Sequence, residues 1–162
     1  MKALKIISVA LALLLLASVA FIGYLYYTAQ VAVIYAESGG SSVSEHEIAD
    51  FEKSLRNDSF CGTVFRKPES WKAPSEYVWL TYRVQLKNNC LVPIDRVEVQ
   101  VIPDPADVLQ PFDSEVHTVP ARTDGEISVS VLSEAGTHPV RELVITFYVW
   151  GKPFSLRTTA GG

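Results

Sequence analysis

The chain has 162 residues, enough for one domain of about 100 to 120 residues beyond an apolar N-terminus. Its net charge at pH 7 is −4, and Lys2 and Lys5 are its only charged residues before Glu37, so the remainder carries −6. An acidic domain with dispersed basic residues is a poor nucleic-acid binder, and this composition excludes that class.

An uncharged segment runs from Ile6 to Ala36. About 20 helical residues cross a hydrocarbon core of about 30 Å, so we expect residues 6–23 to span a membrane, within an anchor that comprises residues 1–36. Basic residues before the span and aromatic residues after it are typical of the two membrane interfaces, and they are Lys2, Lys5, Tyr24, Tyr26 and Tyr27.

The flanking charges predict the orientation of this span. Lys2 and Lys5 precede it, whereas no basic residue follows before Lys53, and basic residues are retained in the cytoplasm. We therefore expect a single-pass protein of the plasma membrane with its N-terminus inside and its domain outside. The alternative is a secretory signal cleaved after Ala20, which would also export the domain.

Beyond the anchor, residues 37–44 have the composition of a flexible linker, and residues 45–162 form the predicted extracytoplasmic domain. Residues 28–36 either extend the helix or begin a strand. Ser44, with Glu47 three residues later, predicts a helix over residues 45–56. Seven strands are then predicted over residues 60–65, 76–87, 94–102, 115–119, 126–132, 140–150 and 153–158.

These short strands alternate apolar and polar residues and are separated by turn residues. In the longest strand, one face is aliphatic and the other carries Tyr77, Trp79 and polar residues. The pattern favours an all-β fold in which seven antiparallel strands form an Ig-like sandwich, preceded by a short helix and the transmembrane helix.

The sequence also resembles several families of exported modules. The segments that carry the resemblance are Tyr82–Asn89 (YRVQLKNN), residues 93–101 (PIDRVEVQV) and residues 119–122 (VPAR). Together they are similar to fibronectin-III-like modules and to the FxLYD and late-embryogenesis-abundant group 2 domains, although the Phe-x-Leu-Tyr-Asp signature is absent. The resemblance covers residues 76–150 and implies a non-enzymatic, seven-stranded sandwich outside the cytoplasm, with no functional residue to carry over.

Cys61 and Cys90 both fall in the exported part, where disulfides persist, so we expect them to be bonded to each other. A loop of about 30 residues closed in this way would stabilise the fold by roughly 3 to 4 kcal/mol. Free thiols or an intermolecular bond are the alternatives.

No motif in the sequence predicts catalysis, a cofactor or a metal. The histidines have no ligand spacing, and the loop that contains Asp104, Asp107 and Asp113 lacks the calcium-binding pattern. Phosphate loops and nucleophile elbows are also missing. We therefore expect neither an enzyme nor a metal or cofactor site. The acceptor pattern that begins at Asn57 would be glycosylated only in a host that modifies exported chains.

Five aromatic residues are the candidate partner contacts, because strand alternation places most of them opposite the aliphatic faces. They are Trp71, Tyr77, Trp79, Tyr148 and Trp150. The alternative is that the helix at residues 45–56 or a long loop covers them. We expect a binding or accessory subunit of a membrane or surface complex. A second hypothesis is a filament subunit whose cleaved apolar segment, residues 21–35, is donated as a strand to its neighbour.

Overall fold

The computed structural model describes residues 2–28, 30–112 and 115–161, and in these ranges it contains a long N-terminal helix and two antiparallel sheets. The five-stranded sheet has the order β1-β3-β7-β5-β2, and the four-stranded sheet has the order β6-β4-β8-β9. The strands are β1 (Val31–Ser42), β2 (Gly62–Val64), β3 (Tyr77–Asn88), β4 (Ile94–Val101), β5 (Asp107–Pro111), β6 (His117–Val119), β7 (Asp124–Glu134), β8 (Arg141–Val149) and β9 (Lys152–Ala160).

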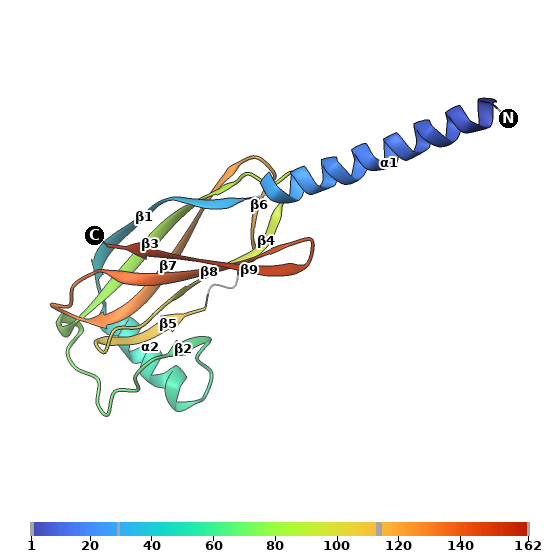
Figure 1. Cartoon of the computed structure of the whole chain (residues 1–162). Coiled ribbons are helices and arrows are strands. Elements are labelled where there is room, and N and C mark those ends of the chain that lie inside the picture. The colour runs from blue at the N-terminus through green and yellow to red at the C-terminus, as the bar shows by residue number, and fades with distance from the viewer. Residues whose placement is uncertain (1, 29, 113–114, 162) are drawn as a thin grey trace.

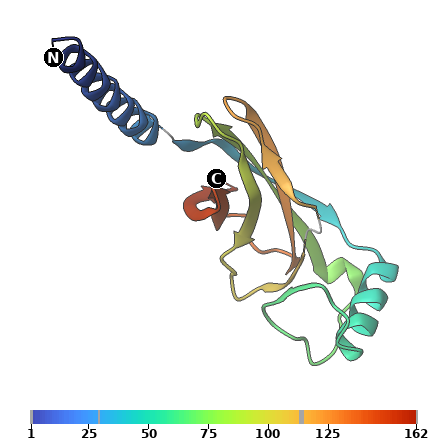
Figure 2. The ribbon, with the colours of Figure 1, turned by 90° about the vertical axis from the view of Figure 1, so that its right-hand side faces the viewer.

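Helix α1 (Lys2–Thr28) projects from one end of the domain, and helix α2 (Glu45–Arg56) lies at the other end (Figure 1). The view from the side shows the same separation (Figure 2). Within α1, Ile6–Tyr24 is long and apolar enough to cross a membrane, and its side chains are exposed in the chain alone. A soluble core helix would be buried, so α1 has the character of a membrane anchor or an export signal.

The segment after α1 is a strand, which corrects the prediction of a flexible linker at residues 37–44. Strand β1 pairs with β3 from Val31, opposite Asn88, to Ser42, opposite Val78. The Gly-Ser composition misled the sequence analysis, because backbone hydrogen bonds to a neighbouring strand need no particular side chains. The folded domain therefore begins at Val31, close behind the helix.

The main core fills the space between the two sheets. The aliphatic face predicted for the longest strand is confirmed, since Leu80, Tyr82, Val84 and Leu86 are all buried in this core. Alternate residues of β7, β4 and β8 complete it from both sheets, and they include Ile127, Val129, Val131, Val97, Val99, Leu143, Ile145 and Phe147. This arrangement is that of a two-layer sandwich.

Nine strands, rather than the predicted seven, make up the described sheets. The additional strands are β1 and β5, and β5 lies in the segment with Asp104, Asp107 and Asp113 that was expected to be a loop. Strand β5 is formed by pairing with β7 and β2, a non-local effect that its own residues do not reveal. The immunoglobulin-like and fibronectin-III-like assignments stay predictions.

A second apolar cluster lies on the outer face of the five-stranded sheet, beneath α2. Tyr77, Trp79 and Leu132 of the sheet pack there against Ile48 and Phe51 of the helix. Further along the same face, the side chains become polar, as at Thr81, Arg83, Gln85, Ser128 and Ser130. The helix predicted at residues 45–56 is confirmed, and the change from apolar to polar residues marks the part of the sheet that it covers.

A buried ion pair joins the two sheets. Arg141 of β8 donates from Nε to Asp107 Oδ2 and from Nη2 to Asp107 Oδ1 of β5, both at 2.8 Å. Arg141 Nη1 donates to the carbonyl oxygens of His138 and Val140 at 2.8 and 2.9 Å, and Tyr82 Oη donates to that of Pro139 at 2.8 Å. Burial raises the pKa of Tyr82 to about 12, so it remains a neutral donor.

The ion pair gives a prediction for stability. In the substitution Arg141→Met, Asp107 is left buried without its counter-ion, and we expect the free energy of unfolding to fall by about 3–5 kcal/mol. Denaturant unfolding of the full chain in detergent, followed by tryptophan fluorescence, measures it. Arg157→Met is the control, because it breaks only the exposed contact with Glu142 and should cost at most about 1 kcal/mol. Equal losses would contradict the assigned role of the buried pair.

The same pair predicts a pH dependence. Burial raises the pKa of Asp107, but the hydrogen bonds from Arg141 and from the Asp104 N–H outweigh it, and the net pKa lies below the ordinary value. This stabilisation is therefore complete above the unfolded pKa of about 3.9, and it is lost as the pH falls through the lower folded pKa. In Arg141→Met, burial is opposed by the Asp104 N–H without the help of Arg141, so the folded pKa of Asp107 rises and we expect acidification to destabilise the variant less than the wild type. The prediction would be refuted if the free energy of unfolding fell by the same amount in the two proteins as the pH is lowered.

Candidate functional site

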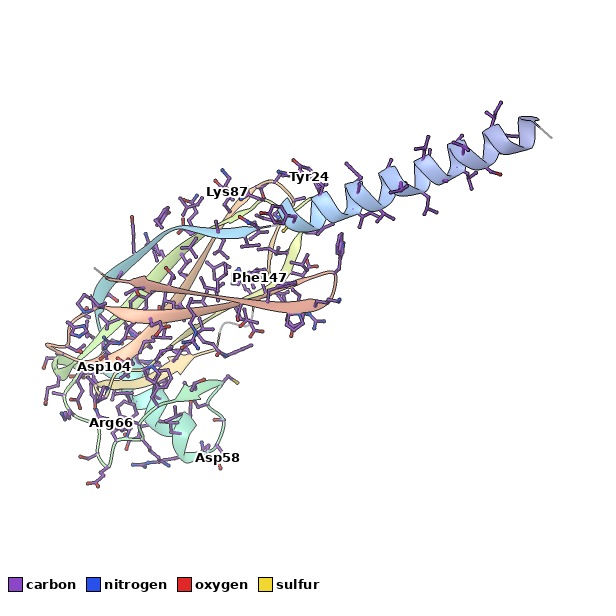
Figure 3. All side chains as sticks on the ribbon, in the orientation of Figure 1. Tyr24, Asp58, Arg66, Lys87, Asp104 and Phe147 are labelled. Carbon is purple, nitrogen blue, oxygen red and sulfur yellow. The ribbon has the colours of Figure 1, made fainter. Side chains whose placement is uncertain are left out.

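An apolar groove of about 490 Å³ opens at the end of the domain from which α1 leaves. It lies between the start of β1, the turn after β3 and the β8–β9 hairpin. We call it the hairpin groove and define it by its lining residues, which are Gln30, Val31, Cys90, Leu91, Val92, Phe147, Val149, Trp150, Lys152, Phe154, Ser155 and Leu156. Figure 3 shows Tyr24 and Lys87 near this end and Asp58 and Arg66 at the opposite end.

Strand alternation explains why the groove is apolar. Phe147 faces the core on β8, and its register partner on β9 is Phe154, whose ring stacks on it with centroids 6.0 Å apart. Phe147 is buried, whereas Phe154 remains 41% exposed. Strands β1 and β9 are edge strands of different sheets that approach each other without pairing, so core-facing side chains are left uncovered there.

A buried asparagine fixes the turn that forms one wall of the groove. The Asn88 side-chain amide donates to the carbonyl oxygens of Val92, Val119 and Pro120 at 3.0–3.1 Å, and its Oδ1 accepts from the Cys90 N–H at 2.9 Å. These bonds tie the β3–β4 turn to the β6–β7 turn. Leu91 is thereby held 49% exposed beside the groove.

The tip of the β8–β9 hairpin has an unusual composition. Trp150 and Gly151 connect Val149 to Lys152, and both have positive φ angles, +50° and +73°. Two-residue hairpin turns of this kind favour Asn-Gly or Asp-Gly, and a bulky residue in the left-handed region costs roughly 1–2 kcal/mol. Trp150 is nevertheless 70% exposed, so packing within this domain does not explain its presence.

The aromatic residues predicted as partner contacts divide into two groups. Trp71, Tyr77 and Trp79 belong to the cluster beneath α2, where Trp79 meets Phe51 at 5.7 Å and Tyr77 meets Trp71 at 5.7 Å. Helix α2 covers this face, as the alternative hypothesis held, and a partner contact of these three residues stays a prediction. Tyr148 and Trp150 lie instead on the β8–β9 hairpin.

Helix α2 is held over these aromatic residues by its own N-cap. Ser44 Oγ and the Ser44 N–H donate to Glu47 Oε2 at 2.7 and 2.8 Å, while Trp79 Nε1 donates to Glu47 Oε1 at 3.1 Å. The Ser44 hydrogen bonds hold the pKa of Glu47 below its usual range. The capping box predicted from sequence therefore also fixes the helix to the sheet.

The expected disulfide is absent, since Cys61 is an exposed free thiol and Cys90 is a buried one. Cys61 precedes edge strand β2, three strands away from β3, which leads into Cys90. Strands are spaced about 4.8 Å apart, which places the two residues well beyond the Cα separation of about 7 Å that a disulfide tolerates. Burial raises the pKa of Cys90. The cysteine count could not reveal this separation, because it depends on strand order.

Other predicted residues are placed as follows. Tyr24 and Tyr27 lie exposed near the end of α1, whereas the side chains of Lys2, Lys5 and Tyr26 lie outside the described part. Asn57 is exposed at the C-terminus of α2, and its glycosylation stays a prediction.

Asp104 and Asp107, which were considered as calcium ligands, bond to groups of the protein instead. Asp107 is paired with Arg141, Asp104 Oδ1 accepts from the Ala106 N–H, and Asp113 lies outside the described residues. Across residues 2–28, 30–112 and 115–161, no three His, Cys, Asp or Glu side chains gather as a metal site would require. That the chain is not an enzyme stays a prediction.

Comparison with known proteins identifies no family. No family model and no curated protein matches the sequence. Among solved structures, one match is a candidate lipoprotein (ycdA) from Bacillus subtilis, with 18% identity and a TM-score of 0.38. The match covers 63% of this chain and 34% of that chain, so the chain spans about a third of the length of that structure.

Alkylation tests the state of the thiols. Without reductant, we expect the folded protein to gain one alkyl group, at Cys61, and the denatured protein to gain two, because unfolding exposes Cys90. Intact mass spectrometry with and without prior reduction counts the groups. If the denatured protein is alkylated only after reduction, the two cysteines are bonded to each other and the disulfide prediction is correct.

Proposed function

We propose that this chain is a single-pass plasma-membrane protein, with its N-terminus in the cytoplasm, whose external sandwich is a binding or accessory subunit of a membrane complex. The hairpin groove is the observation that supports the proposal. It is apolar and ready-formed, and its volume lies within the range of about 300–1,000 Å³ that is typical of binding sites.

The position of the groove favours a partner in the same membrane. Helix α1 continues for one turn beyond Tyr24, which is roughly 6 Å, and at most about 7 Å of chain then leads to Gln30 in the groove wall. The groove is thus within about 13 Å of the end of the span. An apolar segment of a membrane-protein partner, where it emerges from the bilayer, can reach this height.

The lining suits an apolar contact of this kind. Phe154 and Leu91 present half-exposed apolar side chains on opposite walls, and Lys152 is the charged residue among the lining residues. Aromatic residues in partly enclosed, apolar sites supply much of the binding energy of protein interfaces. The partner is therefore expected to place an aliphatic or aromatic side chain between Leu91 and Phe154.

The filament hypothesis has less support from this arrangement. Its donor segment includes residues 31–35, which are the first part of β1 and pair with β3 of the same chain. Donation would require that pairing to be broken. Retention of residues 1–20 in the mature protein, read from intact mass, would remove this hypothesis and the cleaved-signal alternative together.

Photo-cross-linking in intact membranes tests the proposed function. A photoreactive amino acid at position 91 should capture one membrane polypeptide, and Leu91→Glu should lower co-purification of that polypeptide roughly tenfold or more, since a buried charge weakens an apolar contact. Position 112 is the matched control, because Phe112 is 64% exposed but follows β5, near the other edge of the five-stranded sheet. Equal capture from both positions, or none from position 91, would contradict the proposal.

A further inference from the structure

We propose that the tip of the β8–β9 hairpin is a second membrane contact, in which Trp150 enters the headgroup layer of the bilayer that α1 spans. The inference rests on the part of the proposed function that retains α1 as an anchor. The occupant is the lipid surface itself, in contact with the Trp150 indole and the neighbouring apolar rim of the hairpin groove.

The β8–β9 hairpin lies close to the end of α1. The β8–β9 turn and the start of β1 line the same groove, and the chain between Tyr24 and that groove extends about 13 Å at most. A headgroup layer is about 5–8 Å thick on each side of the hydrocarbon core. Figure 1 shows this turn on the side of the domain from which α1 leaves. A modest tilt of the domain brings the tip into the layer.

Tryptophan is an unusual residue for the tip of this hairpin. Trp150 keeps a positive φ that favours Asn or Gly, and it gains little burial within its own domain. Residues that break a local rule without a compensating contact occur at functional sites. Tryptophan is enriched where membrane and water meet, because its ring is apolar and its indole N–H can still bond to water or headgroups.

The surface around Trp150 is apolar and carries charges of both signs. Leu91 and Phe154, 49% and 41% exposed, extend the apolar surface next to Trp150. The charges at this end are mixed, with Lys87, Arg96, Arg122 and Lys152 against Asp95 and Asp124, and Lys87 lies opposite Asp124 in the strand register. Apolar insertion rather than attraction to anionic lipid is therefore expected to dominate.

Depth-dependent fluorescence quenching tests the inference on the full-length protein in phosphatidylcholine liposomes. The chain has three tryptophans, and Trp71 and Trp79 are partly covered by α2 and the loops at the other end. We expect brominated acyl chains to quench one component of the emission. That component should lie at shorter wavelength than the emission of a water-exposed indole, and iodide should not reach it.

Two variants assign the signal. Trp150→Phe should abolish the lipid-quenched component, whereas Trp71→Phe should retain it. Phenylalanine at position 150 keeps an aromatic residue in the turn, so folding is not expected to change. The inference is overturned if the wild type shows no lipid quenching, or if Trp150→Phe is quenched as strongly as the wild type.

The outcomes separate this inference from the proposed function. Lipid quenching of Trp150 without cross-linking from position 91 keeps the membrane contact and removes the partner in the groove. Cross-linking from position 91 without lipid quenching of Trp150 keeps the partner in the groove and removes the membrane contact. If Trp150 is shielded from iodide only when a co-purified polypeptide is present, the tip contacts protein instead, and the lipid inference is wrong.

Discussion

The short connection between α1 and β1 is the constraint on which the functional interpretation depends. The helix ends at Thr28, the strand begins at Val31, and β1 then pairs with β3 along its full length. A flexible linker would let the domain turn freely relative to α1. The paired strand instead keeps one end of the sandwich, with the β3–β4 and β8–β9 turns, next to the end of the helix. That end carries the hairpin groove, and the aromatic cluster is covered by α2. Figure 1 shows α2 at the opposite end of the domain from α1.

The two ends of the domain treat their apolar surface differently. At the far end, α2 covers Tyr77 and Trp79 and is fixed there by the hydrogen bonds of Glu47 to Ser44 and Trp79. At the α1 end no helix performs this task, and Leu91, Trp150 and Phe154 remain exposed. Contiguous apolar surface left open on a soluble domain indicates a contact with something outside it. The uncovered end is the one from which α1 leaves, and under the proposed function it lies nearest the membrane.

The interior of the sandwich combines an ordinary aliphatic core with one polar connection. Asp107 and Arg141 come from different sheets, and both side chains are almost fully buried. Such pairs add little net stability compared with apolar residues of similar size, but they are costly to break. We therefore regard this pair as fixing how the two sheets face each other. Asn88 has a comparable role at the α1 end, where its side chain joins three carbonyl oxygens of two turns.

The sequence by itself determined the apolar span, the helix that begins after Ser44, and the inward aliphatic face of Tyr77–Asn88, because these depend on local composition and on periods of 3.6 and 2 residues. Only the tertiary structure decided which aromatic residues are covered, that Cys61 and Cys90 lie apart, that residues 37–42 pair as a strand, and that Asp107 meets Arg141. Each of these depends on strand order and register, which bring together residues distant in the chain. The groove also depends on the tertiary structure. Val31, Leu91 and Phe154 share no local sequence pattern, and they line one groove only because the start of β1, the β3–β4 turn and the β8–β9 hairpin meet at one end of the domain.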